Sequence, residues 1–446
     1  MIERIARRLL AVTLVLVAGA SVAAVLAQPR QAPPAPLPIL FVHGAGDSAA
    51  LWQTTIWRFE SNGYDPARLF AIDMTHPAPA RDGSAPEENR STTVDQASEL
   101  SAMVTRILLS TGRKRLVLIG SSRGGYAIRN YIKNAGGAAN VEAAILCGTP
   151  NHGVTAQPDT PDGEFNGLGR FLTQLNAGGE VQPGVRFLTL RSDTNDKYAQ
   201  PLRGTEPTGV TYASPELRGA TNIVLPGLDH REVAFHPRAF REMFRFINGT
   251  EPFTLDIAPE DRPVLNGLVS GYVNAAATNL PLAGATVDVF EVDRETGQRL
   301  GGAVHTRAVG ADGLWGPFTA RPGAYYEFVV SATGGRTVHV YRTPFPRSSR
   351  YVHLRMRPAD PADAGSGSVV VLLRSRGYLG VGRDTFSIDG QVPATVPKGV
   401  ATAESTKLRF PAGPPGPVRV VLNQESLTVL TWPFTEGHLV IAEFHY

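Results

Sequence analysis

Short apolar runs alternate with segments of helical periodicity over residues 38–247. The first, 38–44, is a short apolar run that ends in glycine, as is typical of a buried parallel strand. Helical spacing follows at 94–109, behind the capping-competent Ser91-Thr92-Thr93, and again at 126–134. Further strands are expected at 69–73, 115–120, 143–147, 185–190 and 222–225. The alternation predicts an α/β domain over residues 37–250, with a mostly parallel sheet covered on both faces.

The pattern changes after Asn248-Gly249, and no long helical period follows residue 264. Short strands separated by turns replace it. Val352, Leu354 and Met356, for example, alternate with polar residues, as in a half-buried strand. Such strands are expected at 285–292, 325–330, 337–341, 352–356, 369–373 and 418–422. Because 358–367 has the composition of a linker, we expect one or two all-β modules and favour two, at 264–357 and 367–446.

The N-terminus combines a basic start with an uncharged apolar run at 9–27, which is the layout of a secretory signal peptide over residues 1–27. Cleavage is expected before Gln28, and the proline-rich residues 28–36 form an extended linker. The run is just long enough to span a bilayer, so an uncleaved N-terminal membrane anchor is the alternative. We expect an exported protein, periplasmic or extracellular, with no stable membrane span once the signal is removed.

Composition narrows the classes of function. The chain has 446 residues, of which 42% are hydrophobic, enough for about three packed domains. Its formal net charge of +3 is too balanced for a nucleic-acid-binding surface, so no nucleic-acid partner is expected. Cys147 is the single cysteine and excludes an internal disulfide. The sequence contains neither HExxH nor a complete dinucleotide-binding glycine motif, and we expect no metal and no cofactor.

The candidate nucleophile is Ser122, in the segment Gly120-Ser121-Ser122-Arg123-Gly124, which fits G-x-S-x-G. The segment directly follows an expected strand and directly precedes an expected helix. A sharp turn there projects a serine hydroxyl at the carboxyl edge of the sheet, and small flanking residues avoid clashes. The alternatives are a glycine-rich turn or a phosphate-binding loop, although no lysine stands at the P-loop position.

Acyl transfer also requires two backbone N–H groups that hold the oxyanion. We expect one from Arg123, directly after the nucleophile, and the other from Ala45 in the loop after the first strand. Gly44 lets the backbone approach closely. His43 is expected to make structural hydrogen bonds, because it precedes the nucleophile, whereas hydrolases of this kind follow the chain order Ser, acid, His.

The candidate general base is His230, which follows the last expected strand and precedes a helix starting near Pro237. His236 is the alternative base, and His152 comes early in the chain for this role. The structural alternative for either His230 or His236 is a surface histidine that caps the helix that follows.

The acid that orients the imidazole is expected to follow the strand before that of the histidine. Asp196 is favoured and Asp193 is the alternative acid, because Asp193 is well placed to cap its own turn. Asp229 is adjacent to His230 and points the wrong way in most local geometries.

Residues 151–184 form a long insertion rich in Gly, Pro and Asp. Within it, one helical face is formed by Phe165, Leu168, Phe171, Leu172 and Leu175. An amphipathic helix over the mouth of a hydrolase acts as a lid, with its apolar face toward acyl chains. A helix packed permanently on the core is the alternative.

The motifs at 43–44, 120–124, 148–153 and 227–230 together resemble those of secreted bacterial lipases of the α/β-hydrolase superfamily. Segments 243–249, 341–345 and 382–390 resemble an archaeal long-chain lipase that joins a hydrolase domain to a C-terminal β-rich, lipid-binding domain. The resemblance covers nearly all of 37–446 and implies an α/β-hydrolase fold. It departs at Cys147-Gly148, the place of the acid in the archaeal enzyme, so the acid must come later in the chain. Residues 271–332 resemble a transthyretin-like β-sandwich, which implies a fold only.

These features predict a secreted serine carboxylester hydrolase, a triacylglycerol lipase, that acts through an acyl-enzyme on lipid or ester substrates at an interface. The alternative enzyme is a polyester depolymerase of the polyhydroxyalkanoate type, in which the β modules bind the solid. The alternative from another class is a non-catalytic exported binding protein.

Overall fold

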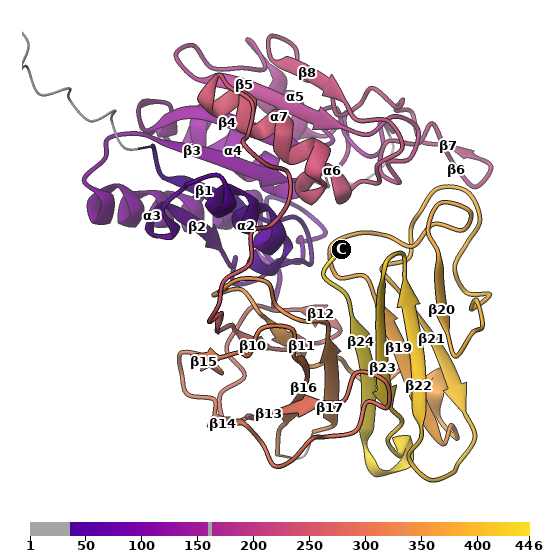
Figure 1. Cartoon of the computed structure of the whole chain (residues 1–446). Helices are drawn as coiled ribbons and strands as arrows, with labels where there is room; N and C mark the ends of the chain where they lie inside the picture. Colours follow the sequence, from indigo (N-terminus) through magenta and orange to yellow (C-terminus); the bar gives the residue numbers. More distant parts are fainter. Residues whose placement is uncertain (1–35, 159–162, 334) are drawn as a thin grey trace, which may run out of the picture. The chain divides into compact units, whose positions relative to one another are not determined.

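Six parallel strands form the sheet of the N-terminal part of the chain (Figure 1). Their order is β2-β1-β3-β4-β5-β8, and Ile39 of β1 lies opposite Leu69 on one side and Val117 on the other. The bounds are β1 Ile39–Val42, β2 Leu69–Ile72, β3 Leu116–Ser121, β4 Val141–Cys147, β5 Arg186–Arg191 and β8 Thr221–Val224. Strands β1 and β3 are buried along their whole length, as expected of parallel strands covered on both faces. The predicted α/β fold is confirmed.

The structure, a computed structural model, describes residues 36–158, 163–333 and 335–446. The expected signal segment 1–27, and all of the linker 28–36 except Pro36, lie outside the described residues. Among the described residues, none of the helices combines the length and the apolar character that a membrane crossing requires. Leu37 to Tyr446 form one compact unit.

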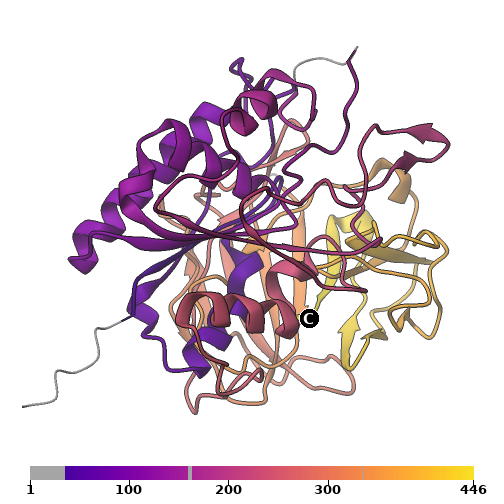
Figure 2. The same cartoon turned by 90° about the horizontal axis from the view of Figure 1, so that it is seen from above.

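Helices cover both faces of the parallel sheet (Figure 2). On one face α2 and α7 pack with Phe41 and Ile119, and on the other α3 and α4 pack with Leu40 and Leu118. Neighbouring residues of a strand enter different cores because their side chains point to opposite faces. The bounds are α2 Gln53–Ser61, α3 Thr93–Thr111, α4 Arg123–Asn134, α5 Arg170–Asn176, α6 Glu232–Phe235 and α7 Pro237–Asn248.

The chain from residue 264 onward is built around a seven-stranded sheet with the order β14-β13-β16-β17-β24-β19-β21 (Figure 1). A three-stranded sheet, β20-β22-β23, accompanies it. The bounds are β13 Thr286–Val292, β14 His305–Ala308, β16 Tyr325–Ser331, β17 Thr337–Arg342, β19 Ser368–Leu373, β20 Phe386–Ile388, β21 Ser405–Phe410, β22 Pro417–Leu422, β23 Glu425–Leu430 and β24 His438–Glu443. The remaining short strands are β6 Leu202–Arg203, β7 Glu206–Pro207, β9 Val264–Leu265, β10 Val269–Ser270, β11 Tyr272–Val273, β12 Ala276–Ala277, β15 Phe318–Thr319 and β18 Leu354–Arg355.

The seven-stranded sheet crosses the boundary that we expected between 264–357 and 367–446. Strand β24 lies between β17 and β19 and runs parallel to both. Its side chains alternate between two cores: Leu439 and Ile441 pack with β13, β16 and β17, whereas Val440 and Ala442 pack with β20, β22 and β23. A strand with two apolar faces belongs in the interior of a sheet. The C-terminal β part is therefore one continuous sheet system rather than two separate modules.

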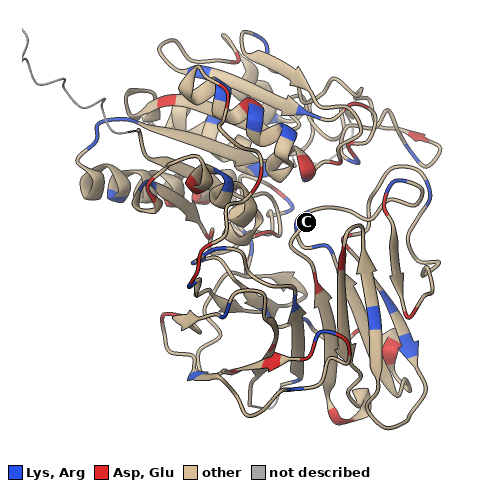
Figure 3. Cartoon of the chain, viewed as in Figure 1, with Lys and Arg blue, Asp and Glu red and all other residues tan. Residues whose placement is uncertain are grey.

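The β part contacts the loops that follow β1 and β2. Arg355 Nη1 donates to the carbonyl oxygen of Gly46 at 2.8 Å, and His353 Nε2 lies 2.9 Å from Asp73 Oδ2. Burial alone would raise the pKa of Asp73, but the charge and the hydrogen bond of His353 outweigh it and lower that pKa to about 2. Polar pairs such as these hold the β part at the carboxyl end of the parallel sheet. Charged residues of both signs are interspersed in both parts of the chain (Figure 3).

Candidate active site

Ser122 lies between β3 and α4, at φ 52° and ψ −120°. A serine rarely adopts positive φ, and such strain persists only where the surroundings hold it. Here the backbone N–H of Ser122 donates to the Cys147 oxygen at 2.8 Å, and Thr149 Oγ1 donates to the Ser122 oxygen at 2.9 Å. A Cβ on Gly124 would lie 2.5 Å from the Val42 oxygen, so only glycine lets α4 start this close to β1. These contacts fix a sharp strand-to-helix turn with Ser122 at its apex.

His230 and Asp196 are brought together after the last two strands of the sheet. His230 Nδ1 lies 2.8 Å from Asp196 Oδ1 and 2.9 Å from Oδ2, and both side chains are 2% exposed. A carboxylate there accepts the Nδ1–H and leaves Nε2 as the basic nitrogen. That Nε2 is buried, and no group in the described part of the chain hydrogen-bonds to it. The ring of Tyr198 meets the imidazole edge-on, with centroids 4.6 Å apart.

Ser122 and His230 open into one cavity of about 410 Å³. Ligand sites are commonly concave, with apolar walls and a few convergent polar groups. The walls contain both kinds of residue: Gly44, Ala45, Asp47, Pro79, Ser121, Ser122, Val154, Thr155, Phe165, Tyr198, Arg203, His230, Arg231 and Tyr378. The structure thus places the expected nucleophile and the expected base around the same space.

The two expected oxyanion donors also lie at this cavity. Ala45 follows β1 and is exposed to the cavity, and Arg123 is the first residue of α4. The first N–H groups of a helix have no partner within the helix, so the Arg123 N–H is available to an anion. A Cβ on Gly44 would lie 3.0 Å from Ser122 Cβ and 3.2 Å from the Ser121 oxygen. The absence of a side chain at Gly44 therefore lets the first loop lie against the nucleophile turn.

The side chain of Arg123 is wholly buried and anchors the start of α4. It forms an ion pair with Glu164, which is 1% exposed, and donates from Nη1 to Ser91 Oγ at 2.8 Å. Burial raises the pKa of Glu164, and the neighbouring Arg123 acts in the opposite direction. Sequence patterns gave no signal for this pair, because its members are far apart in the chain and share no motif.

The other candidate histidines are used elsewhere. His43 Nε2 accepts the backbone N–H of Met74 at 3.0 Å, and burial lowers its pKa, so it serves as the structural hydrogen-bonder that we expected. His152 Nε2 pairs with Glu180 at 3.0 Å. His236 caps α7, its Nδ1 accepting the Arg238 N–H at 3.1 Å. None of the three lines the cavity that contains Ser122.

The two other aspartates near the histidine also have structural roles. Asp193 accepts the backbone N–H groups of Asn195 at 3.2 Å and Gly227 at 3.1 Å, so it caps its own turn. Asp229 accepts the N–H groups of Arg231 and Glu232 at the start of α6. Of the three carboxylates, only that of Asp196 hydrogen-bonds to the imidazole of His230.

The insertion at 151–184 contains a helix shorter than the predicted apolar face. Among the described residues of the insertion, only α5, Arg170–Asn176, is helical, and Leu172 and Leu175 pack on Tyr126 of α4. Leu168 is exposed, whereas Phe165 lines the cavity. Residues 159–162 of the insertion lie outside the described residues. The helix itself is packed on the core, as in the second of the two expected arrangements.

Tyr198, Arg231 and Tyr378 line the cavity but were not expected from the sequence. Tyr198 lies two residues after the candidate acid, and Arg231 lies one residue after the candidate base. This closeness in the sequence is the signal that could have indicated them. Arg231 Nη2 lies 2.8 Å from Asp47 Oδ2, which also lines the cavity. Tyr378 comes from the β part, and no local pattern indicates it. Within the described ranges, no three His, Cys, Asp or Glu side chains are grouped so that they could hold a metal ion.

Two family models match parts of the chain. The family model described as Lipase (class 2) matches residues 36–204, and the model described as Lipase C-terminal domain matches residues 266–359. The curated proteins give no match. These matches confirm the resemblance to lipases that carry a C-terminal β-rich domain.

Several solved structures are similar to part of the chain. The mature form of Bacillus licheniformis lipase BlEst2 is 21% identical, with a TM-score of 0.37, over 49% of this chain and 96% of that one. Aspergillus fumigatus lipase B is 17% identical, with a TM-score of 0.37, over 51% and 56%. Bacillus subtilis carboxylesterase CesB is 16% identical, with a TM-score of 0.28, over 50% and 86%.

Proposed function

We propose that this chain, a carboxylic ester hydrolase of the lipase and esterase class, cleaves lipid esters such as triacylglycerol with a Ser122–His230–Asp196 triad. The observation that carries the proposal is the contact of His230 Nδ1 with Asp196. It leaves Nε2 as the free base in the cavity that Ser122 lines. Asp193 and His236, the alternatives from the sequence, are occupied with capping.

The chemistry follows from these positions. Ser122 Oγ attacks the ester carbonyl while His230 Nε2 takes its proton, and Asp196 stabilises the imidazolium. The oxyanion of the tetrahedral intermediate accepts hydrogen bonds from the N–H groups of Ala45 and Arg123. Collapse breaks the ester C–O bond, and the leaving alcohol takes the proton from His230. Water, deprotonated by His230, then attacks the acyl carbonyl; the bond to Ser122 Oγ breaks, the fatty acid leaves, and His230 returns the proton to Ser122.

The cavity walls support a substrate with an apolar acyl group. Val154, Phe165, Tyr198 and Tyr378 supply apolar and aromatic surface beside the nucleophile. Burial of each additional methylene of an acyl chain contributes about 0.8 kcal/mol of binding free energy. We therefore expect kcat/KM to rise with chain length until the chain outgrows the cavity.

Replacing Ser122 by alanine tests the proposal. We expect Ser122→Ala to lose about 10³-fold or more in kcat on p-nitrophenyl esters and on emulsified triacylglycerol, because the nucleophile is gone. Ser110→Ala, an exposed serine on α3, is the matched control and should keep full activity. A fluorophosphonate probe should label wild type and the control but not Ser122→Ala.

The contrary outcomes are distinct. Undiminished hydrolysis by Ser122→Ala would falsify the nucleophile assignment. Failure of the wild type to react with the fluorophosphonate would favour a non-catalytic binding protein. Clearing of a polyester film faster than hydrolysis of triacylglycerol would favour the depolymerase.

A further inference from the structure

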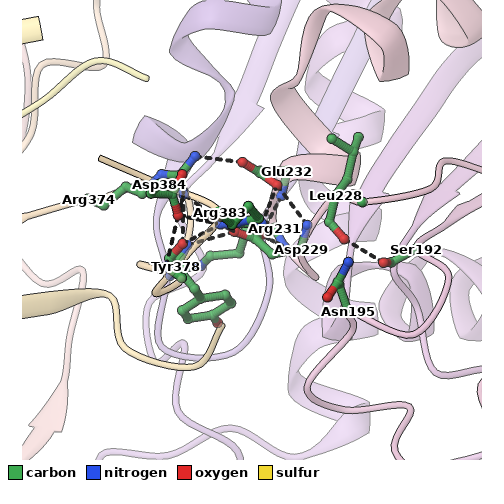
Figure 4. Close-up of polar contacts among 12 residues, drawn as sticks. Ser192, Asn195, Leu228, Asp229, Arg231, Glu232, Arg374, Tyr378, Arg383 and Asp384 are labelled. Carbon is green, nitrogen blue, oxygen red and sulfur yellow. Dashed lines mark hydrogen bonds and ion pairs between the residues drawn. The ribbon is translucent and has the colours of Figure 1, made fainter. Parts of the chain in front are cut away.

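The turn that carries His230 is bound from outside the catalytic domain by an ionic network (Figure 4). Asp229, which is fully buried, accepts the backbone N–H of Tyr378 at 2.8 Å and Arg383 Nη2 at 3.2 Å through Oδ2. Glu232 accepts Arg374 Nη2 at 2.6 Å and Arg383 Nη1 at 2.8 Å. The segment 374–384 of the β part thus contacts the residue before His230 and the second residue after it.

The same two carboxylates also fix the backbone of the turn. Asp229 Oδ1 accepts the N–H groups of Arg231 at 2.8 Å and Glu232 at 2.9 Å. Glu232 Oε2 accepts the Asp229 N–H at 2.7 Å. His230 lies inside this closed set of hydrogen bonds, so a shift of either carboxylate moves the imidazole.

The partner segment is itself held together. Arg374 Nη1 and Arg383 Nη2 each donate to the backbone carbonyl oxygen of Tyr378 at 2.6 Å. Asp384 Oδ2 accepts from the same two nitrogens at 3.1 Å and 2.9 Å. Arg374 is almost fully buried and Arg383 is about one-quarter exposed. Charge-assisted hydrogen bonds in such surroundings are stronger than neutral ones, so the network is a rigid support.

The ring of Tyr378 touches the neighbours of both the acid and the base. Lys197 Nζ, one residue after Asp196, lies 3.8 Å from the ring centroid. Arg231 Cζ, one residue after His230, lies 5.4 Å from it. Cations at these distances from an aromatic face are attracted to it. The same ring forms part of the wall of the Ser122 cavity.

We infer that segment 374–384 of the β part positions the catalytic acid–base pair: Arg374 and Arg383 hold the His230 turn, and Tyr378 spans the residues that follow Asp196 and His230. The inference rests on the proposed function of the triad. A displacement of about 1 Å at a catalytic group costs on the order of 100-fold in rate. The β part is then a component of the active site.

The experiment must separate positioning from simple adhesion between the two parts of the chain. Arg383→Met removes the contacts to Asp229, Glu232 and the backbone carbonyl oxygen of Tyr378, while a side chain of similar aliphatic character remains at position 383. Arg347→Met is the matched control, because Arg347 also bridges the parts, pairing with Glu60 at 3.1 Å and Glu260 at 2.8 Å, away from the cavity. Both variants are made in the full chain, and the melting temperature reports the stability that each one loses.

We expect Arg383→Met to lower kcat on a p-nitrophenyl ester about tenfold or more, with KM changed less than about threefold. The rate constant for fluorophosphonate labelling of Ser122 should fall in parallel, because this reaction needs the acid–base pair but little substrate binding. Arg383→Lys should restore part of the rate. Arg347→Met should keep kcat within about twofold at a similar loss of melting temperature.

Equal kcat and labelling rates in Arg383→Met and wild type would overturn the inference, as would an equal loss in Arg347→Met. If Arg383→Met does not fold, Tyr378→Leu replaces it, because its backbone contacts with Asp229 and the two arginines remain. A folded Tyr378→Leu with a labelling rate about threefold or more below wild type supports positioning, and an unchanged rate overturns it. Ser122→Ala keeps the two questions apart, since its inactivity upholds the triad whatever the Arg383 result.

Discussion

At the scale of single residues, the site is defined by which polar atoms are already occupied. Asp193 and Asp196 are three positions apart and follow the same strand, β5. Asp193 uses both oxygens on backbone N–H groups, including that of Gly227 at 3.1 Å. Asp196 accepts one backbone N–H, from Tyr198 at 2.8 Å, and contacts His230. Of the two, only Asp196 hydrogen-bonds to the imidazole, and we therefore propose it as the residue that orients His230.

The two aspartates should respond differently to the same substitution. Asp196→Asn replaces a carboxylate by an amide that cannot stabilise the imidazolium, and we expect kcat to fall about 10³–10⁴-fold with the fold retained. Asp193→Asn should change kcat less than about threefold and lower stability by about 1 kcal/mol, because an amide has one fewer accepting oxygen for its turn. Steady-state kinetics and urea unfolding of both variants check this. The reverse ranking of kcat would assign the acid to Asp193.

At the scale of elements, local signals located the helix starts well where capping residues mark them. Helix α3 was expected to begin behind Ser91-Thr92-Thr93, and Thr92 with Asp95 forms a capping box there. The apolar face at 165–175 was misleading, because the Val154 N–H donates to the Phe165 oxygen at 2.8 Å, the Gly167 N–H donates to the Thr155 oxygen at 2.6 Å, and Gly169 is extended. Tertiary contact therefore keeps the chain out of helix until Arg170. Periodicity alone does not report such contacts.

Helix α7 carries a cap that titrates. His236 Nδ1 accepts the Arg238 N–H only when the ring is neutral, and burial, followed by the charge of Arg238, lowers its pKa to about 4. The His236 imidazole therefore becomes protonated near pH 6.5 in the unfolded chain and near pH 4 in the folded chain. The stability that the neutral ring confers is complete above about pH 6.5 and is lost as the pH falls toward 4. The ring is partly exposed, and with solvent screening the loss should be about 1–2 kcal/mol.

His236→Asn tests this cap. Asparagine is a good helix cap that does not titrate, so stability at pH 7 should change little. Between pH 7 and pH 4.5 the variant should lose about 1–2 kcal/mol less than wild type, measured by urea unfolding at the two pH values. An equal loss in both proteins would show that His236 is not the titrating group.

At the scale of the whole molecule, the sequence did not predict contacts between residues that are far apart in the chain and meet only through packing. Ser122 and His230 were located because each lies in the short connection between a strand and a helix, a pattern contained within a few residues. Tyr378 and Arg383 contact the His230 turn from far along the chain, and only the docking of the β part brings them there. The parallel sheet was predicted for the same local reason. The continuous β part was not, because strand β24 pairs with β17 and β19 across a linker.

If the sheet is continuous, the two cores of the β part should unfold together in urea, whereas two separate modules would unfold independently. Trp315 packs in the core that contains Ile441, and Trp432 packs against the core that contains Val420. With 5-fluorotryptophan at the four tryptophans, ¹⁹F NMR follows each core separately during urea unfolding. We expect the native Trp315 and Trp432 signals to disappear at the same urea concentration, because β24 belongs to both cores.

Truncating one core at a time completes this argument. Ile441→Ala removes apolar volume from the Trp315 core only, and Val420→Ala removes it from the Trp432 core only. Each should cost about 1–5 kcal/mol, and in one cooperative unit each should lower both midpoints together. Two independently folding modules would behave differently. Ile441→Ala would then shift only the Trp315 midpoint, and Val420→Ala would shift only the Trp432 midpoint. Assignment of the resonances by single Trp→Phe replacements makes the comparison unambiguous.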